Sequence, residues 1–231
     1  MRWIERVIVR QARRTRATGF RVAVVTDSAA AFPGDWLTIS GPVAGVTVVS
    51  MPVMISGRIF GEGSDDLTEP LTIALAEGAE VRTSRPSPGQ FESVYRRLQN
   101  DGFDEILSIH LSGKLSGTVD AARWAAGAVS IPVQVIDSGT VGMALGFGVA
   151  AAAHALDSGR TTGEAAAEAL ETCNASSLYF YVPSLDQLRR GGRIGAAASV
   201  LGTLLAVKPI LTVKDGLIVP LERVRTAPKA L

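Results

Sequence analysis

The sequence predicts an α/β fold built on a mostly parallel β-sheet with helices on its faces. Short β-branched runs alternate with segments whose apolar residues have helical spacing, a pattern typical of βαβ units. The 231 residues suffice for one large core or two modest ones. No uninterrupted apolar run reaches the roughly 18 residues that a membrane-spanning helix requires. We therefore expect a soluble protein.

The first two thirds of the chain carry this alternation most clearly. Ser87 and Pro88 supply a hydroxyl cap and a first-turn proline ahead of one of the helices. Strands that alternate with helices in this way form a parallel sheet that is covered on both faces. We expect strands over 21–25, 46–49, 105–109 and 133–136, and helices over 67–76, 90–98, 118–126 and 142–156.

After the turn at 157–161 the pattern restarts, so we predict a second, smaller α/β lobe. We place the boundary within the long helix, near residue 150. The last residues look like a helix cut short, so we expect the chain to end before its fold does. The elements expected here are helix 162–172, strand 178–182, a basic helix at 185–190 and a hairpin of 210–213 with 217–221. The regions are a basic N-terminal extension (1–20), an N-terminal lobe (21–150) and a C-terminal lobe (151–231).

Composition excludes several classes of protein. The net charge is +1, so no overall positive field attracts nucleic acid. Cys173 is the single cysteine, which excludes an internal disulfide framework and indicates a reducing cytoplasm. Metal-ligand spacing and the glycine-rich phosphate loops are absent, so we expect no metal and no cofactor. The arginine-rich residues 1–20 suggest an arm that contacts a membrane surface or a partner, or else a frayed extension.

Two hydroxyl-rich loops are the strongest candidates for a binding site. They are Thr83-Ser84-Arg85-Pro86-Ser87, and the segment 112–118, which follows a strand and runs into a helix near Ser116. A carboxylate there would meet hydroxyl donors and helix N-terminal amides. Thr26-Asp27-Ser28 ends the first strand, at the edge where open α/β sheets bind ligands. Helix capping is the alternative role for Asp27, Ser28 and Ser116.

Catalysis has weaker support. Lys114 stands where a nucleophile elbow around Ser116 would need glycine, and His110, the one candidate base, has no obvious orienting acid. Ala29 occupies the position where a phosphatase or phosphotransferase would need a second acid after Asp27. We therefore expect a binding protein that is not an enzyme. The alternative is a small serine esterase or a transferase that uses Ser116 and His110.

Read in order, these segments resemble the DegV family of bacterial fatty-acid-binding proteins. The resemblance runs from about Val22 to the last residue. It rests on Thr26-Asp27-Ser28, Thr83-Ser84-Arg85-Pro86-Ser87, Leu115-Ser116-Gly117-Thr118, Asp137-Ser138, the segment from Leu185 to Gly-Gly-Arg-Ile at 191–194, Lys208-Pro209-Ile210-Leu211 and Arg225-Thr226-Ala227-Pro228-Lys229-Ala230-Leu231.

The resemblance implies two α/β lobes that enclose a long-chain fatty acid such as palmitate. Ser84, with Thr83 beside it, and Ser116 would hold the carboxylate. The ligand would be presented to a fatty-acid kinase, with Arg193 and Arg225 as docking or head-group residues. The candidate ligand-binding residues are Asp27, Ser28, Thr83, Ser84, Ser87, Ser116, Thr118, Arg193 and Arg225.

Departures from the family pattern also concern the head group. Arg85 replaces a common glutamine and Lys114 adds a second cation, so the site is expected to be more electropositive than usual. The family also has a carboxylate-binding histidine near a Gly-Pro-Gly segment, and this sequence has no such segment.

Overall fold

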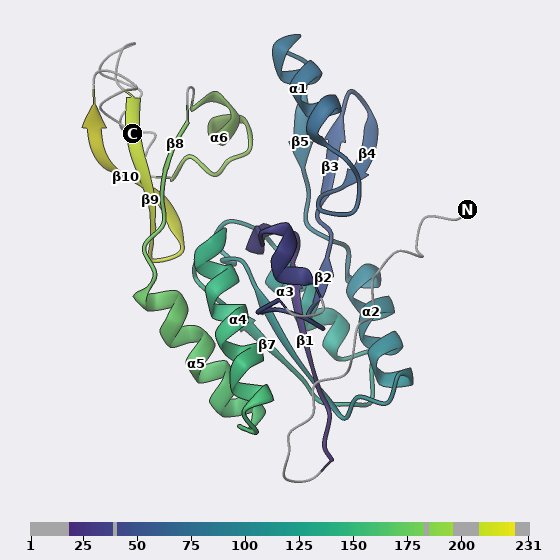
Figure 1. Ribbon diagram of the computed structural model, residues 1–231. Coiled ribbons are helices and arrows are strands. Elements are labelled where there is room, and N and C mark those ends of the chain that lie inside the picture. Colours follow the sequence, from purple (N-terminus) through teal and green to yellow (C-terminus); the bar gives the residue numbers. More distant parts are fainter. Residues whose placement is uncertain (1–18, 39–40, 183–184, 196–207, 225–231) are drawn as a thin grey trace.

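A four-stranded parallel sheet forms the centre of the computed structural model, which describes residues 19–38, 41–182, 185–195 and 208–224 (Figure 1). The strand order is β2-β1-β6-β7, and each neighbouring pair is parallel. The predicted parallel sheet is thus confirmed, with each strand within two residues of its expected bounds. The strands are β1 (Val22–Asp27), β2 (Thr47–Val49), β6 (Glu105–His110) and β7 (Val133–Asp137).

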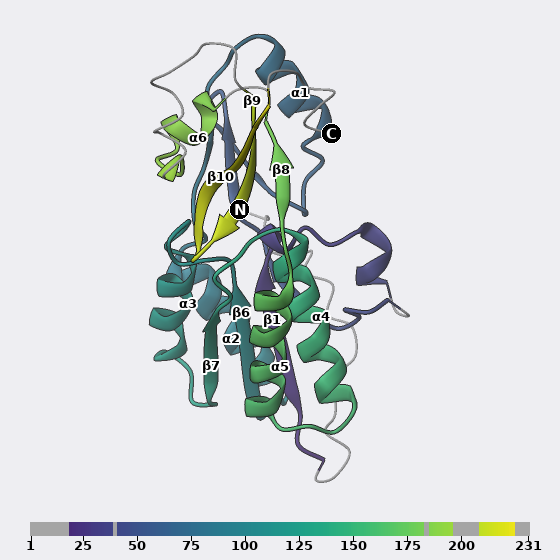
Figure 2. The same cartoon turned by 90° about the vertical axis from the view of Figure 1, so that its left-hand side faces the viewer.

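Helices cover both faces of this sheet, as Figure 2 shows. β1 is buried along its whole length and its side chains alternate between two cores. Val22 and Val24 join the core under α4 and α5. Ala23 and Val25 join the core with Phe91 under α2 and α3. The helices are α2 (Pro88–Asn100), α3 (Thr118–Ala126), α4 (Met143–Asp157) and α5 (Thr162–Ala175).

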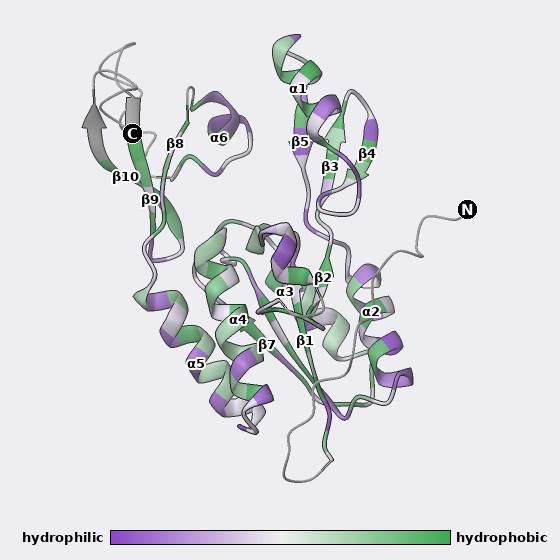
Figure 3. Ribbon diagram, in the orientation of Figure 1, coloured by the Kyte–Doolittle hydropathy of each residue, from purple (hydrophilic) through white to green (hydrophobic). Residues whose placement is uncertain are grey.

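α4 is the most apolar helix and is coloured green along most of its length in Figure 3. It packs closely along α5, and Gly148 allows the approach, because a Cβ there would lie 2.9 Å from the carbonyl oxygen of Ala169. Residue 150, the expected lobe boundary, lies inside this helix. The division into lobes at that residue stays a prediction.

Two small antiparallel sheets project from the same end of the parallel sheet (Figures 1 and 2). One has the order β4-β3-β5 and carries α1; the other has the order β10-β9-β8 and lies beside α6. The first of these sheets was not predicted. The elements are β3 (Pro52–Ile55), β4 (Arg58–Gly61), α1 (Thr68–Ala76), β5 (Val81–Thr83), β8 (Tyr179–Tyr181), α6 (Asp186–Arg190), β9 (Lys208–Lys214) and β10 (Leu217–Val224), and two 3-10 turns cover Ser28–Ala30 and Gly34–Leu37.

Some expectations fall outside the described residues. These are the basic arm at 1–18, Arg225 and the final helical turn at 227–231. In the part of the chain that the structure describes, every helix is too short or too polar to cross a bilayer.

Candidate functional site

The loops that follow β1, β6 and β7 meet at the carboxyl edge of the parallel sheet. His110 ends β6 and lies opposite Asp137, the last residue of β7. The Asp137 carboxylate accepts the Gly113 N–H at 3.1 Å and the Gly139 N–H at 2.9 Å. It therefore fixes the first turn of the 111–118 loop, which contains Ser116. The edge is the one at which α/β sheets usually bind ligands.

The 83–87 loop leaves β5 and enters α2. Ser84 is half-buried, and its N–H donates to the carbonyl of Pro52 at 3.0 Å, which extends the pairing of β5 with β3. Thr83 is exposed. The Ser87 hydroxyl accepts the Gln90 N–H, and the Gln90 side chain accepts the Ser87 N–H, so the two form a capping box. Capping accounts for Ser87, whose ligand contact stays a prediction.

The 111–118 loop carries a pair of buried hydroxyls. Ser116 is 7% exposed, and its Oγ lies 2.8 Å from Oγ1 of Thr118, which is fully buried. α3 begins at Thr118, its N-cap is Gly117, and no side chain makes the cap hydrogen bond. The alternative role of Ser116 as a helix cap is therefore excluded. Both hydroxyls retain further hydrogen-bonding capacity.

Arg85 and Gly117 bring the two loops together. A Cβ at Gly117 would overlap Nη1 of Arg85 and would lie 3.1 Å from its Cδ and 3.3 Å from its Cζ. The guanidinium of Arg85 therefore rests on the main chain between Ser116 and Thr118. This contact places the residue after Ser84 directly against the residue after Ser116.

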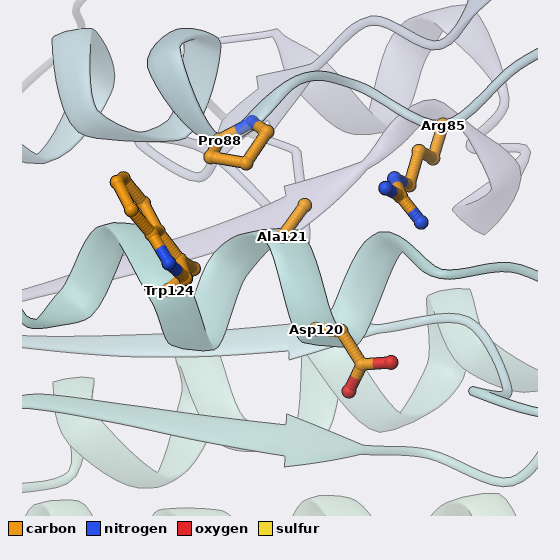
Figure 4. Close-up of a pocket in the computed structure, with 5 residues that line it drawn as sticks. All are labelled: Arg85, Pro88, Asp120, Ala121 and Trp124. Carbon is orange, nitrogen blue, oxygen red and sulfur yellow. The ribbon is translucent and has the colours of Figure 1, made fainter.

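A small cavity opens beside this contact (Figure 4). Its volume is about 240 Å³, and Trp124 in its wall is 71% exposed. Ser84 and Ser116 are not among its lining residues. The lining comprises Arg85, Pro88, Asp120, Ala121 and Trp124.

The 111–118 loop makes two hydrogen bonds to the turn between β9 and β10 and one to Arg193, which follows α6. The Ser112 hydroxyl donates to the Gly216 carbonyl at 2.8 Å, and Lys114 Nζ donates to the Asp215 carbonyl at 2.9 Å. Arg193 Nε donates to the Leu115 carbonyl at 2.9 Å. Arg193 thus binds the main chain of the residue before Ser116, and its predicted docking or head-group role stays untested.

Asp27 lies in a buried network beneath this loop. Its carboxylate accepts the N–H groups of Ala29 and Leu111, each at 3.1 Å, and lies 2.9 Å from His110 Nδ1. His110 Nε2 lies 2.7 Å from the hydroxyl of Ser108. Asp27 is therefore the orienting acid that the sequence did not reveal. No local sequence pattern indicates this contact, because it depends on β6 lying next to β1.

This network does not form the site that an esterase would need. The serine on His110 is Ser108 rather than Ser116, and Ser108 is also bonded to the Tyr95 hydroxyl at 2.8 Å. Asp27, His110, Ser108 and Tyr95 are all fully buried. Burial raises the pKa of Tyr95, so its hydroxyl keeps its proton and remains a donor. Ser108, His110 and Asp27 have the hydrogen-bond distances of a catalytic triad, but a substrate has no access to these buried side chains.

The hydroxyl of Ser28, another candidate ligand-binding residue, makes two hydrogen bonds within the chain. It donates to the Glu62 carboxylate at 2.8 Å and accepts the Met51 N–H at 3.0 Å. It therefore links the end of β1 to the segments before β3 and after β4. In the described part of the chain, no three His, Cys, Asp or Glu side chains gather into a group that could hold a metal.

The fold defines an α/β protein of the covered parallel-sheet class, with hydroxyl-bearing loops at the carboxyl edge of the sheet. The chain belongs to the DegV family, since residues 21–231 match the family model described as "Uncharacterised protein, DegV family". A DegV domain-containing protein of Streptomyces coelicolor is 47% identical over 210 residues, which are 91% of this chain and 73% of that protein. A DegV domain-containing protein of Deinococcus radiodurans is 36% identical over 211 residues, which are again 91% of this chain and 73% of that protein.

Solved structures of the family have the same fold. A DegV family protein from Thermus thermophilus, described by its fatty acid binding, superposes with a TM-score of 0.82 at 37% identity, covering 91% of this chain and 74% of that one. DegV from Bacillus subtilis, described as a fatty acid binding protein, superposes with a TM-score of 0.79 at 31% identity. The match covers 90% of this chain and 73% of that one. The two-lobed DegV fold expected from the sequence is thereby confirmed.

Proposed function

We propose that this protein binds a long-chain fatty acid, with the carboxylate at the hydroxyls of Ser84 and Ser116 and the acyl chain between the two lobes. The observation that carries the proposal is the contact of Arg85 with Gly117, which joins the two hydroxyl loops at the carboxyl edge of the sheet. The fatty acid binding of the Thermus thermophilus and Bacillus subtilis proteins supports the same ligand class.

The acyl chain would supply most of the binding free energy. Burial of each methylene contributes about 0.8 kcal/mol, so a dozen methylenes contribute about 10 kcal/mol before the entropy of association is subtracted. Hydroxyl donors contribute less, but they are directional. The serines therefore set the orientation of the ligand, with its head group at the loops.

We further propose that the protein is a non-catalytic, cytoplasmic carrier that presents the carboxylate to a fatty-acid kinase, which converts it to an acyl phosphate. Both ring nitrogens of His110 are engaged within the core, so this histidine is not available as a base beside Ser116. Exposed Arg85 and Trp124 lie next to the loops. A partner that contacts Arg85 and Trp124 would therefore lie next to the loops that carry the proposed head-group site.

Mass spectrometry of bound lipid tests the ligand. Protein purified natively and then extracted with organic solvent should release a long-chain fatty acid in near-stoichiometric amount. Recovery of none from the full-length protein contradicts the proposal. The carrier role is tested by adding a fatty-acid kinase catalytic subunit and ATP to the loaded protein. Acyl phosphate, trapped as the hydroxamate, should form only when both proteins are present.

A further inference from the structure

Arg85 is an exposed cation with no ion-pair partner among the described residues, although it lies at the junction of the two loops. The one acid that lines the same cavity is Asp120, and its carboxylate is engaged by Arg123 at 3.5 Å. The guanidinium is also held in place, because its Cδ and Cζ rest on the main chain at Gly117. A positioned cation without a counter-ion is a ready partner for an anion.

The other two cations at this site have partners. Lys114 Nζ donates to the carbonyl of Asp215, and Arg193 Nε donates to the carbonyl of Leu115. Lys114 therefore joins the 111–118 loop to the turn between β9 and β10, and Arg193 joins the segment after α6 to the same loop. Arg85 makes no such bond within the described residues, so its planar set of donors is available to a ligand.

We propose that Arg85 is the specificity-determining residue that makes this site select anionic head groups, with a phosphoryl group preferred to a carboxylate. The inference rests on the proposed fatty-acid site and deepens it. Serine hydroxyls favour a charged acceptor but can also bond a neutral alcohol or ester, and they carry no positive charge of their own. A guanidinium forms charge-assisted hydrogen bonds, which are about twice as strong as neutral ones. A dianionic phosphoryl group gains more from it than a carboxylate does.

A ligand series of constant chain length separates the head group from the acyl chain. Delipidated wild-type protein, R85Q and R85K are titrated with hexadecan-1-ol, hexadecanoic acid and hexadecylphosphonic acid. R85Q should weaken binding of the acid about tenfold, the size expected for the loss of one hydrogen bond to a charged group. Binding of the phosphonate should weaken by more than about tenfold. Binding of the alcohol should change less than about twofold, since only the head-group charge is affected. R85K should restore part of the preference.

R96Q is the matched control for net charge. Arg96 lies on α2, is exposed and pairs with Glu92 at 2.8 Å. Its loss should leave the affinity ratio of acid to alcohol unchanged. If R85Q and R96Q alter that ratio equally, or R85Q leaves it unaltered, the proposal is overturned.

G117A tests the same inference without removing the charge. The new Cβ would displace the guanidinium of Arg85, while the backbone φ of −74° accommodates alanine. G117A should lower the acid-to-alcohol ratio, and combining it with R85Q should add little, because both changes remove one interaction. A wild-type ratio in G117A overturns the proposal. Unchanged circular dichroism spectra confirm that the variants fold.

The ligand series distinguishes failure of the fatty-acid site from failure of the Arg85 role. If the wild-type protein binds none of the three ligands, the fatty-acid site itself is wrong and the role of Arg85 with it. If the wild-type protein binds all three and R85Q retains the wild-type ratio, only the specificity role of Arg85 is wrong.

Discussion

Nδ1 of His110 lies 2.9 Å from Oδ2 of Asp27, and both side chains are completely buried. All the donors in this network are matched when Tyr95 donates to Ser108, Ser108 donates to Nε2 of His110, and Nδ1–H donates to Asp27. The same carboxylate accepts the N–H of Leu111, the first residue of the 111–118 loop. The network therefore ties two neighbouring strands to the start of the candidate binding loop.

Asp27→Ala should lower the free energy of unfolding by about 3 to 5 kcal/mol, because it leaves the buried Leu111 N–H and His110 Nδ1 without an acceptor. Tyr95→Phe removes one hydrogen bond at the far end of the network and should cost about 1 kcal/mol. Urea denaturation followed by circular dichroism measures both. A smaller loss for Asp27→Ala than for Tyr95→Phe would contradict this account of the network.

The double variant Ser84→Ala with Ser116→Ala should weaken binding of a fatty acid by about 2 to 4 kcal/mol, since hydrogen bonds to a charged group contribute about 1.5 to 3 kcal/mol each and the loop relaxes in part. The methyl ester of the same acid should lose less. Displacement of a fluorescent fatty acid measures both affinities. Ser93→Ala is the control, because Ser93 is exposed on α2 and bonds only the Gly89 carbonyl. Equal losses of affinity for the acid and the ester would contradict the proposed head-group role of Ser84 and Ser116.

Long periodic segments were predictable because their signal is local. The expected helix 118–126 is α3 without change, and α2 begins at Pro88, directly after the predicted cap Ser87. β3, β4 and β5 escaped prediction because each is short and includes proline, glycine or arginine, whereas the equally short β2 and β8 are unbroken β-branched or aromatic runs. Their register depends on pairing partners that the sequence does not identify, and tight turns such as Ser56–Gly57, with both φ values positive, have weak signals here.

The site was predictable to the level of its loops. Ser116 lies in the loop after β6, at the carboxyl edge of the parallel sheet where ligands usually bind. Ser84 follows β5 of the antiparallel sheet β4-β3-β5, so this edge rule does not account for it. The ligand contacts of both serines stay predictions. The contacts between distant residues were not predictable. His110 and Asp27 are 83 positions apart and meet only because β6 lies next to β1. The contact of Arg85 with Gly117 depends likewise on the relative positions of α2 and α3, which no local pattern specifies.

Gly148→Ala and Gly163→Ala should have opposite effects on stability. A Cβ at Gly148 would overlap Sγ of Cys173 and approach the Ala169 carbonyl, so overpacking should cost about 1 to 3 kcal/mol. A Cβ at Gly163, in the first turn of α5, would meet nothing within 4 Å, so alanine should stabilise the protein by about 0.4 to 1 kcal/mol. Thermal unfolding compares them. Unchanged stability of Gly148→Ala would contradict the close packing of α4 on α5, and a loss in Gly163→Ala would contradict the open surroundings of that residue.

Alkaline pH should destabilise the protein through two buried acids. Burial raises the pKa of the Cys173 thiol from 9.0 to about 11 and raises that of Tyr95 above its usual 10.0. The folded state therefore holds protons that the unfolded chain releases. Stability should be unaffected by these groups below about pH 9 and should fall as pH rises through the pKa values of the unfolded chain.

Urea midpoints between pH 8 and 11 measure this dependence, and Cys173→Ala and Tyr95→Phe isolate the two contributions. Each variant starts less stable at pH 8 because it loses packing or a hydrogen bond. Each should nevertheless lose less further stability than the wild type on going to pH 11, because its unfolded state has one fewer proton to release. Parallel pH profiles for the wild type and both variants would show that neither group is held protonated by the fold. Since Tyr95 ends the network that reaches Asp27, a flattened profile for Tyr95→Phe would also support the assignment of its hydroxyl as the donor to Ser108.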